Sequence, residues 1–220
     1  AAGGTHVVTW DNVTCRLADT DRSVNANGLQ VHGTITKSAV ATGADLVGYS
    51  ANGNAANYME QPYNSDLNFG TGDFCFNVWS TLTAGSGLFQ LTDMSAGSYG
   101  TKYLGLLYSN GSIRLRCSGL SQQYVRGTSV SEYLMFTVVR RSGYVTVYEN
   151  GVQVLSGVDT HDYTFATDTS LLTNTYIYAG SIATCSNSLA LLRISATAPS
   201  ASQIKTIYEA EKPLFQENAQ

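Results

Sequence analysis

The chain has 220 residues, of which 43% are hydrophobic and 13% are charged, against roughly 25% charged in a typical soluble domain. Its formal net charge is −4 and no Lys/Arg cluster occurs, which argues against nucleic acid as a partner because phosphates attract a basic surface. No run of about 18 apolar residues occurs either, so the sequence predicts no membrane span.

The predicted elements begin with a polar N-terminal segment, residues 1–45, which we expect to be a β-rich extension or linker. It precedes a single domain predicted over residues 46–220, a size at which β-sandwiches commonly stay undivided. The chain starts at Ala1 without Met and without a leader pattern, so we expect a fragment of a longer protein.

Short alternating segments separated by turn residues predict an all-β meander through the domain. Asn-Gly pairs begin at Asn27, Asn52, Asn110 and Asn150, and such pairs favour type I′ hairpin turns because both residues tolerate positive φ. The segment YVTVY at 144–148 alternates strictly, as a strand with two different surroundings does. The predicted strands span residues 28–35, 56–61, 73–82, 87–91, 103–108, 112–118, 134–140, 144–149, 152–155, 175–179 and 188–194.

One helix is predicted near the C-terminus. Ser200 and Gln203 form a capping-box pattern, which satisfies amide groups at a helix start. Ile204 and Tyr208 then lie on one apolar face at helical spacing, and Pro213 ends the pattern. We expect this helix to be a clip packed on the sandwich.

Four cysteines lie far apart without close pairs, so a zinc site is not predicted: Cys15, Cys75, Cys117 and Cys185. We expect them to be reduced and structural, with one or two disulfide bridges as the alternative. Sequons for N-glycosylation start at Asn12 and Asn110, which matter only in a eukaryotic secretory setting. We interpret Asn110 as a hairpin residue instead.

Four segments follow one another between residues 57 and 215. They are a GxFxxxxW strand within 57–83, a strand pair at 137–154, NTYIYAGS at 174–181, and a closing strand with a QIxxxY helix within 189–215. Together they resemble the laminin-G-like branch of the concanavalin A-like lectin/glucanase superfamily. The resemblance implies an all-β jelly-roll sandwich of two antiparallel sheets with a short C-terminal helix. That superfold hosts lectins, adhesins and hydrolases, so it does not define a function.

Three phrases are similar to virion proteins of tailed bacteriophages: GLQVHGTITKSAVATGADLVGYS at 28–50, EQPYNSDLNFGTGDF at 60–74 and ATAPSASQIKTIYEAEKPLFQENA at 196–219. This resemblance implies a tail-fibre or other tail-associated domain of the virion that acts outside the cell. It also implies a homo-oligomer, a trimer as in most tail fibres, with other virion proteins as partners. Reduced cysteines agree with it, because virions assemble in a reducing cytoplasm.

A hydrolase site is not predicted. Members of the superfamily that cleave glycans carry a Glu-x-Asp-x-x-Glu strand with its carboxylates on one face, and no such string occurs here. Glu149 is isolated beside a predicted turn, Glu132 precedes a predicted strand, and most other Glu residues lie in the predicted helix or the C-terminal tail. His161 beside Asp162 is the alternative base, but no Ser or Cys motif accompanies it.

Strand alternation predicts a ligand-binding face. Six residues are predicted to face the core: Phe76, Val78, Ile113, Leu115, Val145 and Val147. Seven then share the opposite face: Asn77, Trp79, Arg114, Arg116, Tyr144, Thr146 and Tyr148. Aromatic rings can stack on sugar faces while Arg and Asn bind hydroxyls or carboxylates, so we predict a glycan on a lectin-like concave sheet. The alternatives are ligand-binding loops at the sandwich rim, ordinary cross-strand packing, and a core position for Trp79.

Calcium is the one cofactor that the resemblance implies, because related domains hold it at a rim through Asp and backbone oxygens. The candidate ligands are Asp93, in the loop LTDMSAGSYG, and the pair Asp159 and Asp162. The alternative is that all three cap turns of their own backbone.

These observations predict a non-catalytic recognition domain of a phage virion that binds a host-surface glycan, multivalently through its oligomer. A structural or oligomerisation domain of a tail fibre without its own ligand is the alternative. An enzyme that degrades glycans comes third.

Overall fold

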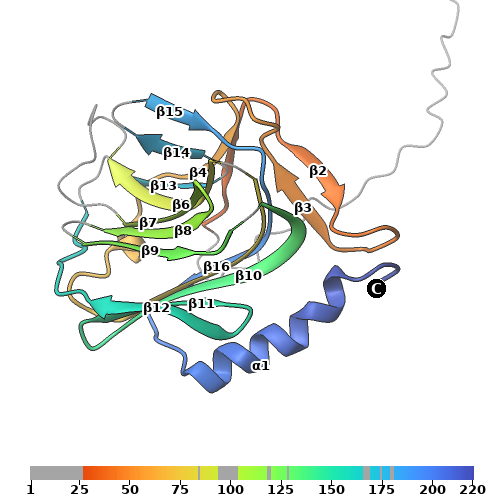
Figure 1. Cartoon of the computed structure of the whole chain (residues 1–220). Coiled ribbons are helices and arrows are strands. Elements are labelled where there is room, and N and C mark those ends of the chain that lie inside the picture. Colours follow the sequence, from red (N-terminus) through yellow and green to blue (C-terminus); the bar gives the residue numbers. More distant parts are fainter. Residues whose placement is uncertain are drawn as a thin grey trace, which may run out of the picture.

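The computed structural model describes residues 27–83, 85–93, 104–117, 120–127, 129–165, 169–173, 175–178 and 181–220. Two antiparallel sheets of seven strands pack face to face, and one C-terminal helix lies outside them (Figure 1). The predicted all-β, jelly-roll-like sandwich is therefore confirmed. No helix in the described part of the chain is long and apolar enough to cross a membrane.

The chain crosses several times between the two sheets. Sheet A has the order β1 (Gln30–His32), β4 (Tyr58–Gln61), β13 (Thr169–Thr173), β6 (Ser86–Asp93), β7 (Leu104–Ser109), β8 (Ser112–Cys117) and β9 (Leu120–Val125). Sheet B has the order β12 (Val152–Val158), β11 (Tyr144–Glu149), β10 (Val130–Arg141), β5 (Phe74–Leu82), β16 (Ser188–Ser195), β3 (Val47–Ser50) and β2 (Thr36–Ala39). A hairpin of β14 (Thr175–Tyr178) and β15 (Ser181–Thr184) lies beside β6.

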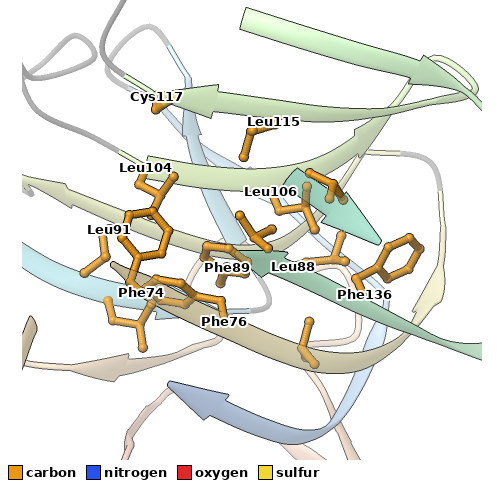
Figure 2. Packing of buried hydrophobic residues seen from close by; sticks show 14 of the residues in the cluster. Phe74, Phe76, Leu88, Phe89, Leu91, Leu104, Leu106, Leu115, Cys117 and Phe136 are labelled. Atoms are coloured by element: carbon orange, nitrogen blue, oxygen red, sulfur yellow. The ribbon is translucent and has the colours of Figure 1, made fainter. Parts of the chain in front are cut away.

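The core lies between the inner faces of the two sheets (Figure 2). Phe76 of sheet B stacks on Phe89 of sheet A with ring centroids 4.4 Å apart. All six residues predicted to face the core are fully buried: Phe76, Val78, Ile113, Leu115, Val145 and Val147. Each buried side chain of this size contributes about 1.5–3 kcal/mol relative to an exposed one, so this interior accounts for the two-layer arrangement.

Two of the four Asn-Gly pairs form hairpin turns, at Asn110 between β7 and β8 and at Asn150 between β11 and β12, whereas Asn52 lies in the turn from β3 of sheet B to β4 of sheet A. All three pairs have positive φ at both residues. Asn52, Asn110 and Asn150 have φ of 53°, 50° and 52°. The amide of Asn150 donates to the carbonyl of Met135, and its side-chain oxygen accepts from the amide of Met135 at 2.9 Å. Asn110 is thus a turn residue, as interpreted from the sequence, whereas the Asn27 pair lies in the segment before β1.

The sequence pattern missed β2, β3, β9, β13 and β15. The strands β2 (TKSA) and β9 (LSQQYV) are short and carry little apolar alternation, because both lie at or near the sheet edges. Within the segment 1–45, β1 pairs with β4 and β2 pairs with β3. The division at residue 45 therefore does not follow the sheets, since residues 30–39 complete both of them.

The C-terminal helix α1 (Ala201–Glu211) begins with the capping box predicted from Ser200 and Gln203. Pro213 lies in a following 3-10 turn, η2 (Lys212–Phe215), which ends the helix; a second such turn is η1 (Ser65–Leu67). The helix covers the outer face of sheet B (Figure 1). Its Ile204 is fully buried against that face. The prediction of a packed clip is confirmed.

Candidate functional site

The structure divides the predicted ligand-binding face between two sheets. Asn77 and Trp79 lie on β5, and Tyr144 and Tyr148 on β11, all on the outer face of sheet B. Arg114 and Arg116 lie on β8 in sheet A. The prediction of one concave face that holds all six candidate ligand-binding residues is therefore wrong. Alternation predicted correctly that they point away from the interior between the two sheets, but it does not show to which sheet a strand belongs.

Trp79 and Asn77 are covered rather than open to a ligand. Trp79 is 1% exposed, stacks on Phe215 at 4.1 Å between ring centroids, and donates from Nε1 to Glu211 at 2.7 Å. Asn77 is 5% exposed and donates to Thr137 Oγ1 at 2.7 Å. Trp79 therefore anchors the C-terminal helix, which agrees with the core position weighed as an alternative.

The part of this face that α1 leaves open forms a groove of about 360 Å³, called here the Tyr144 groove. It is lined by Val139, Arg141, Ser142, Tyr144, Thr146, Tyr148, Pro199, Ser200 and Ala201. Tyr144 is 56% exposed, while Tyr148 is half-buried against the helix side of the face. The groove thus combines an accessible aromatic ring with hydroxyl groups and one guanidinium.

The tight turn between β10 and β11 positions these side chains. Ser142 and Gly143 have φ of 49° and 78°, and the Ser142 amide donates to Asp73 Oδ1 at 2.8 Å. The register sets Arg141 directly opposite Tyr144, so their side chains stand together on the outer face. Arg141 Nη2 donates to the carbonyl of Ala198, which ties the groove floor to the segment before α1.

Arg114 and Arg116 define a separate polar region on the outer face of sheet A. The register places Arg116 opposite Gly105, and Gly105 opposite Gln90. Both arginines are half-buried, and the buried Nε of Arg114 makes no hydrogen bond with the part of the chain that the structure describes. This region is a second place where a polar ligand could bind.

Two of the three candidate calcium ligands, Asp159 and Asp162, are engaged by other groups of the chain. Asp159 is fully buried, and its carboxylate accepts from His161 Nδ1 at 2.8 Å and from the Tyr163 hydroxyl at 2.9 Å, with Arg140 Nε 3.6 Å away. Asp162 accepts from the amide and hydroxyl of Thr164, which is the turn-capping alternative. An arginine in contact with Asp159 opposes a second cation, so the residues of this pair do not fit calcium.

The third candidate, Asp93, ends β6, where its backbone pairs with Thr169. Its side chain lies outside the described residues. Across the described part of the chain, no group of three or more His, Cys, Asp or Glu side chains is gathered in a way that could hold a metal ion.

Two of the candidate acid–base groups, His161 and Glu149, form ion pairs. His161 pairs with Asp159, not with Asp162 as weighed from the sequence. Glu149 accepts from Arg126 Nε at 2.9 Å, and Glu132 is an exposed residue of β10. The described residues that line the Tyr144 groove include no Asp or Glu.

Three of the cysteines, Cys75, Cys117 and Cys185, are buried thiols, as expected for structural cysteines. Burial raises the pKa of Cys75 to about 12 and the pKa of Cys117 and Cys185 to about 11. A thiol with a raised pKa is a poor nucleophile at neutral pH, because the thiolate is the reactive form. Cys15 lies outside the described residues.

Sequence reasoning missed Arg141, Ser142 and the segment Pro199–Ala201 as groove residues. Arg141 continues the outward alternation of β10, so the strand period could have indicated it. The segment before α1 is some 50 residues further along the chain, and nothing in its sequence indicates where it packs.

No family model matches the chain, and no curated protein matches it. Among solved structures, domain 4 of AbnA, an extracellular GH43 arabinanase of Geobacillus stearothermophilus solved with arabinotriose, has a TM-score of 0.64 and 16% identity, over 86% of this chain and 93% of that one. The binding domain of Paraclostridial Mosquitocidal Protein 1 has a TM-score of 0.63 and 14% identity, over 87% of this chain.

The receptor-binding domain of a botulinum neurotoxin of the C/D mosaic serotype has a TM-score of 0.59 and 12% identity, over 84% of this chain. The present chain spans about half the length of the two toxin domains, 49% and 46% respectively. At these identities the likeness shows the fold alone. The class that it defines is a two-sheet β-sandwich, a fold that this chain shares with two toxin binding domains and with one domain of an arabinanase.

Proposed function

We propose that the chain is a non-catalytic recognition domain that binds carbohydrate in the Tyr144 groove. The observation that carries this proposal is the accessible ring of Tyr144, directly opposite Arg141 in a groove whose other walls supply hydroxyl groups. The apolar C–H face of a pyranose stacks on an aromatic ring, while its hydroxyls accept from a guanidinium and exchange hydrogen bonds with Ser and Thr. Structural neighbours that bind sugars or receptors support the same class of function.

The setting of this domain is proposed from the sequence resemblance. We place it on the virion of a tailed phage, in a tail fibre or tail-associated protein, with a host-surface glycan as ligand. A shallow groove binds one sugar weakly, so a homotrimer would supply affinity through effective concentration. Contacts with other virion proteins belong to the same proposal.

A second candidate, a scaffold domain without its own ligand, is favoured by one feature. Val125 at the end of β9 is 70% exposed and Val152 at the start of β12 is 65% exposed. Both strands are sheet edges, and an ion pair joins Arg126, which follows β9, to Glu149 at the end of β11, the neighbour of β12. This valine edge, defined by Val125 and Val152, leaves apolar surface beside unpaired strand edges, which suits subunit packing.

The test is a microbial glycan array probed with the wild-type domain, with Tyr144→Ala, and with Val31→Ala as an exposed apolar control on the other sheet, away from the valine edge. We expect specific binding that Tyr144→Ala weakens about tenfold and that Val31→Ala leaves unchanged. Binding that survives Tyr144→Ala would move the site to Arg114 and Arg116. A blank array from an oligomeric sample would contradict recognition and favour the scaffold.

A further inference from the structure

A buried arginine closes one end of the sandwich. Arg140, near the end of β10, is 1% exposed and follows Phe136 and Val138 on the inner face of sheet B. A permanently charged side chain inside a core is costly unless every donor finds an acceptor. The contacts of Arg140 show how the charge is held.

The guanidinium of Arg140 is surrounded by oxygen atoms from two separate segments. Its Nη1 donates to the carbonyls of Gly70 and Gly72, each at 3.2 Å. Its Nε and Nη2 both donate to the carbonyl of Asp159, at 3.2 and 2.9 Å. Three main-chain carbonyls therefore converge on one cation, together with the Asp159 carboxylate 3.6 Å from Nε.

The neighbouring groups complete the enclosure. The ring of Tyr163 lies 5.4 Å from the guanidinium carbon, and the Tyr163 amide donates to the carbonyl of Gly70 at 2.8 Å. The Asp159 carboxylate accepts from Tyr163 and from His161, so both of its oxygens are already engaged. The Asp159 amide donates to the carbonyl of Gly143 at 2.7 Å, which joins the β10–β11 turn to the same cluster.

Carbonyl oxygens and a carboxylate converging from separate loops are the ligands that a hard cation such as Ca²⁺ takes. Here the protein places its own monovalent cation among them. We propose that Arg140 is a built-in cation that fastens residues 70–72, Asp159 and the β10–β11 turn at this rim without a metal ion. The calcium implied for Asp159 and Asp162 is replaced there by a guanidinium.

The proposal is tested by chemical rescue. Arg140→Ala removes the cation and leaves its oxygen cage, so we expect the melting temperature to fall by about 10 °C or more. Millimolar guanidinium should recover part of that loss, while NaCl at equal ionic strength should not, because guanidinium alone reproduces the planar donors. Arg141→Ala is the matched control: it removes an exposed arginine one residue away, and neither a large loss nor a rescue is expected.

The wild-type domain gives the complementary measurement, which does not depend on a variant that folds. We expect its melting temperature to be the same with EDTA and with added Ca²⁺. In an NMR spectrum of arginine side chains, one Nε–H should exchange slowly with water under both conditions, and Arg140→Lys should remove that signal. A wild-type melting temperature that EDTA lowers and Ca²⁺ restores would overturn the proposal. So would an Arg140→Ala variant as stable as Arg141→Ala.

Discussion

The indole side chain of Trp79 connects the strand β5 to the C-terminal helix α1. Its ring lies between the outer face of sheet B and the end of α1, and its N–H donates to Glu211. Glu211 also accepts from Arg193 of the neighbouring strand β16, with 2.5 Å between Nη2 and Oε1. Trp79, which the sequence pattern placed on the surface of a sheet, therefore anchors α1 to sheet B.

Replacing the indole of Trp79 by a smaller ring that has no hydrogen-bond donor tests that role. We expect Trp79→Phe to lower the free energy of unfolding by about 1–3 kcal/mol, since a partly buried carboxylate loses a donor. Urea unfolding followed by circular dichroism measures the loss. Tyr144→Phe, which removes an exposed hydroxyl, should stay within about 0.5 kcal/mol of wild type. A Trp79→Phe protein of unchanged stability would contradict the anchor role.

The buried thiols give a pH dependence with a definite sign. The folded state holds the pKa of Cys75, Cys117 and Cys185 above the ordinary value of 9.0, so it favours the neutral thiol. Below pH 9 both states are protonated and this contribution to stability is complete. Above pH 9 the unfolded chain loses protons first, so stability should fall by up to about 1.4 kcal/mol per pH unit for each thiol until the folded pKa is reached.

Urea unfolding midpoints at pH 8, 9 and 10 in the presence of a reductant measure this fall. Replacing the three buried cysteines by Ala should flatten the pH profile even though it lowers stability overall. A wild-type profile that rises between pH 9 and 10 would show that other groups dominate in this range.

At the scale of elements, the start of α1 belongs both to the fold and to the Tyr144 groove. The Ser200 hydroxyl accepts from the Gln203 amide, and Gln203 Oε1 accepts from the Ser200 amide at 2.8 Å. The same Ser200 lines the groove beside Tyr144 and Tyr148. The cap therefore sets the position of one groove wall.

Ser200→Ala removes this cap. We expect a loss of about 1 kcal/mol in the free energy of unfolding, which a lower melting temperature would report. Ser202→Ala, two residues further along, deletes a hydroxyl that caps no amide and should cost clearly less. Equal losses in the two variants would show that the cap contributes nothing specific.

The sequence predicted the strands whose side chains alternate strongly, such as Tyr144–Glu149, and it predicted which of their residues point inward. It could not predict that β5 and β8 lie in different sheets, because a period of two contains no information on strand order. The cage of Arg140 was equally hidden, since its acceptors lie 19 to 70 residues away along the chain. Contacts between residues far apart in the sequence therefore determine which residues line the Tyr144 groove and which surround Arg140.

Because only 13% of the residues in the whole molecule are charged, few charged side chains are available to prevent its edge strands from pairing with other chains. The strand β12 (VQVLSGV) has no charged residue or proline, and β9 has none either. Natural edge strands commonly carry such residues to prevent pairing with other chains. The valine edge is therefore the part of the described surface best suited to contact between copies.

Lysine substitutions at the valine edge test whether copies of the chain contact one another there. We expect Val125→Lys and Val152→Lys to change folding stability by no more than about 0.5 kcal/mol and to weaken self-association in sedimentation experiments. Val31→Lys introduces the same charge on β1, at the opposite edge of sheet A, and should leave the oligomer intact. An oligomer that tolerates both valine-edge substitutions would place the interface elsewhere.

Two consecutive arginines end β10, and the pleat of the strand turns them to opposite sides. Arg140 lies among the carbonyls of the rim, whereas Arg141 lines the Tyr144 groove. If such domains diverge in evolution, we expect arginine to be retained at position 140 wherever the contacts of Arg140 with residues 70–72 and Asp159 are retained. Position 141 would be free to change with the ligand. A saturation-mutagenesis library sorted first for folding and then for binding would separate the two adjacent positions, the first sort retaining Arg only at 140.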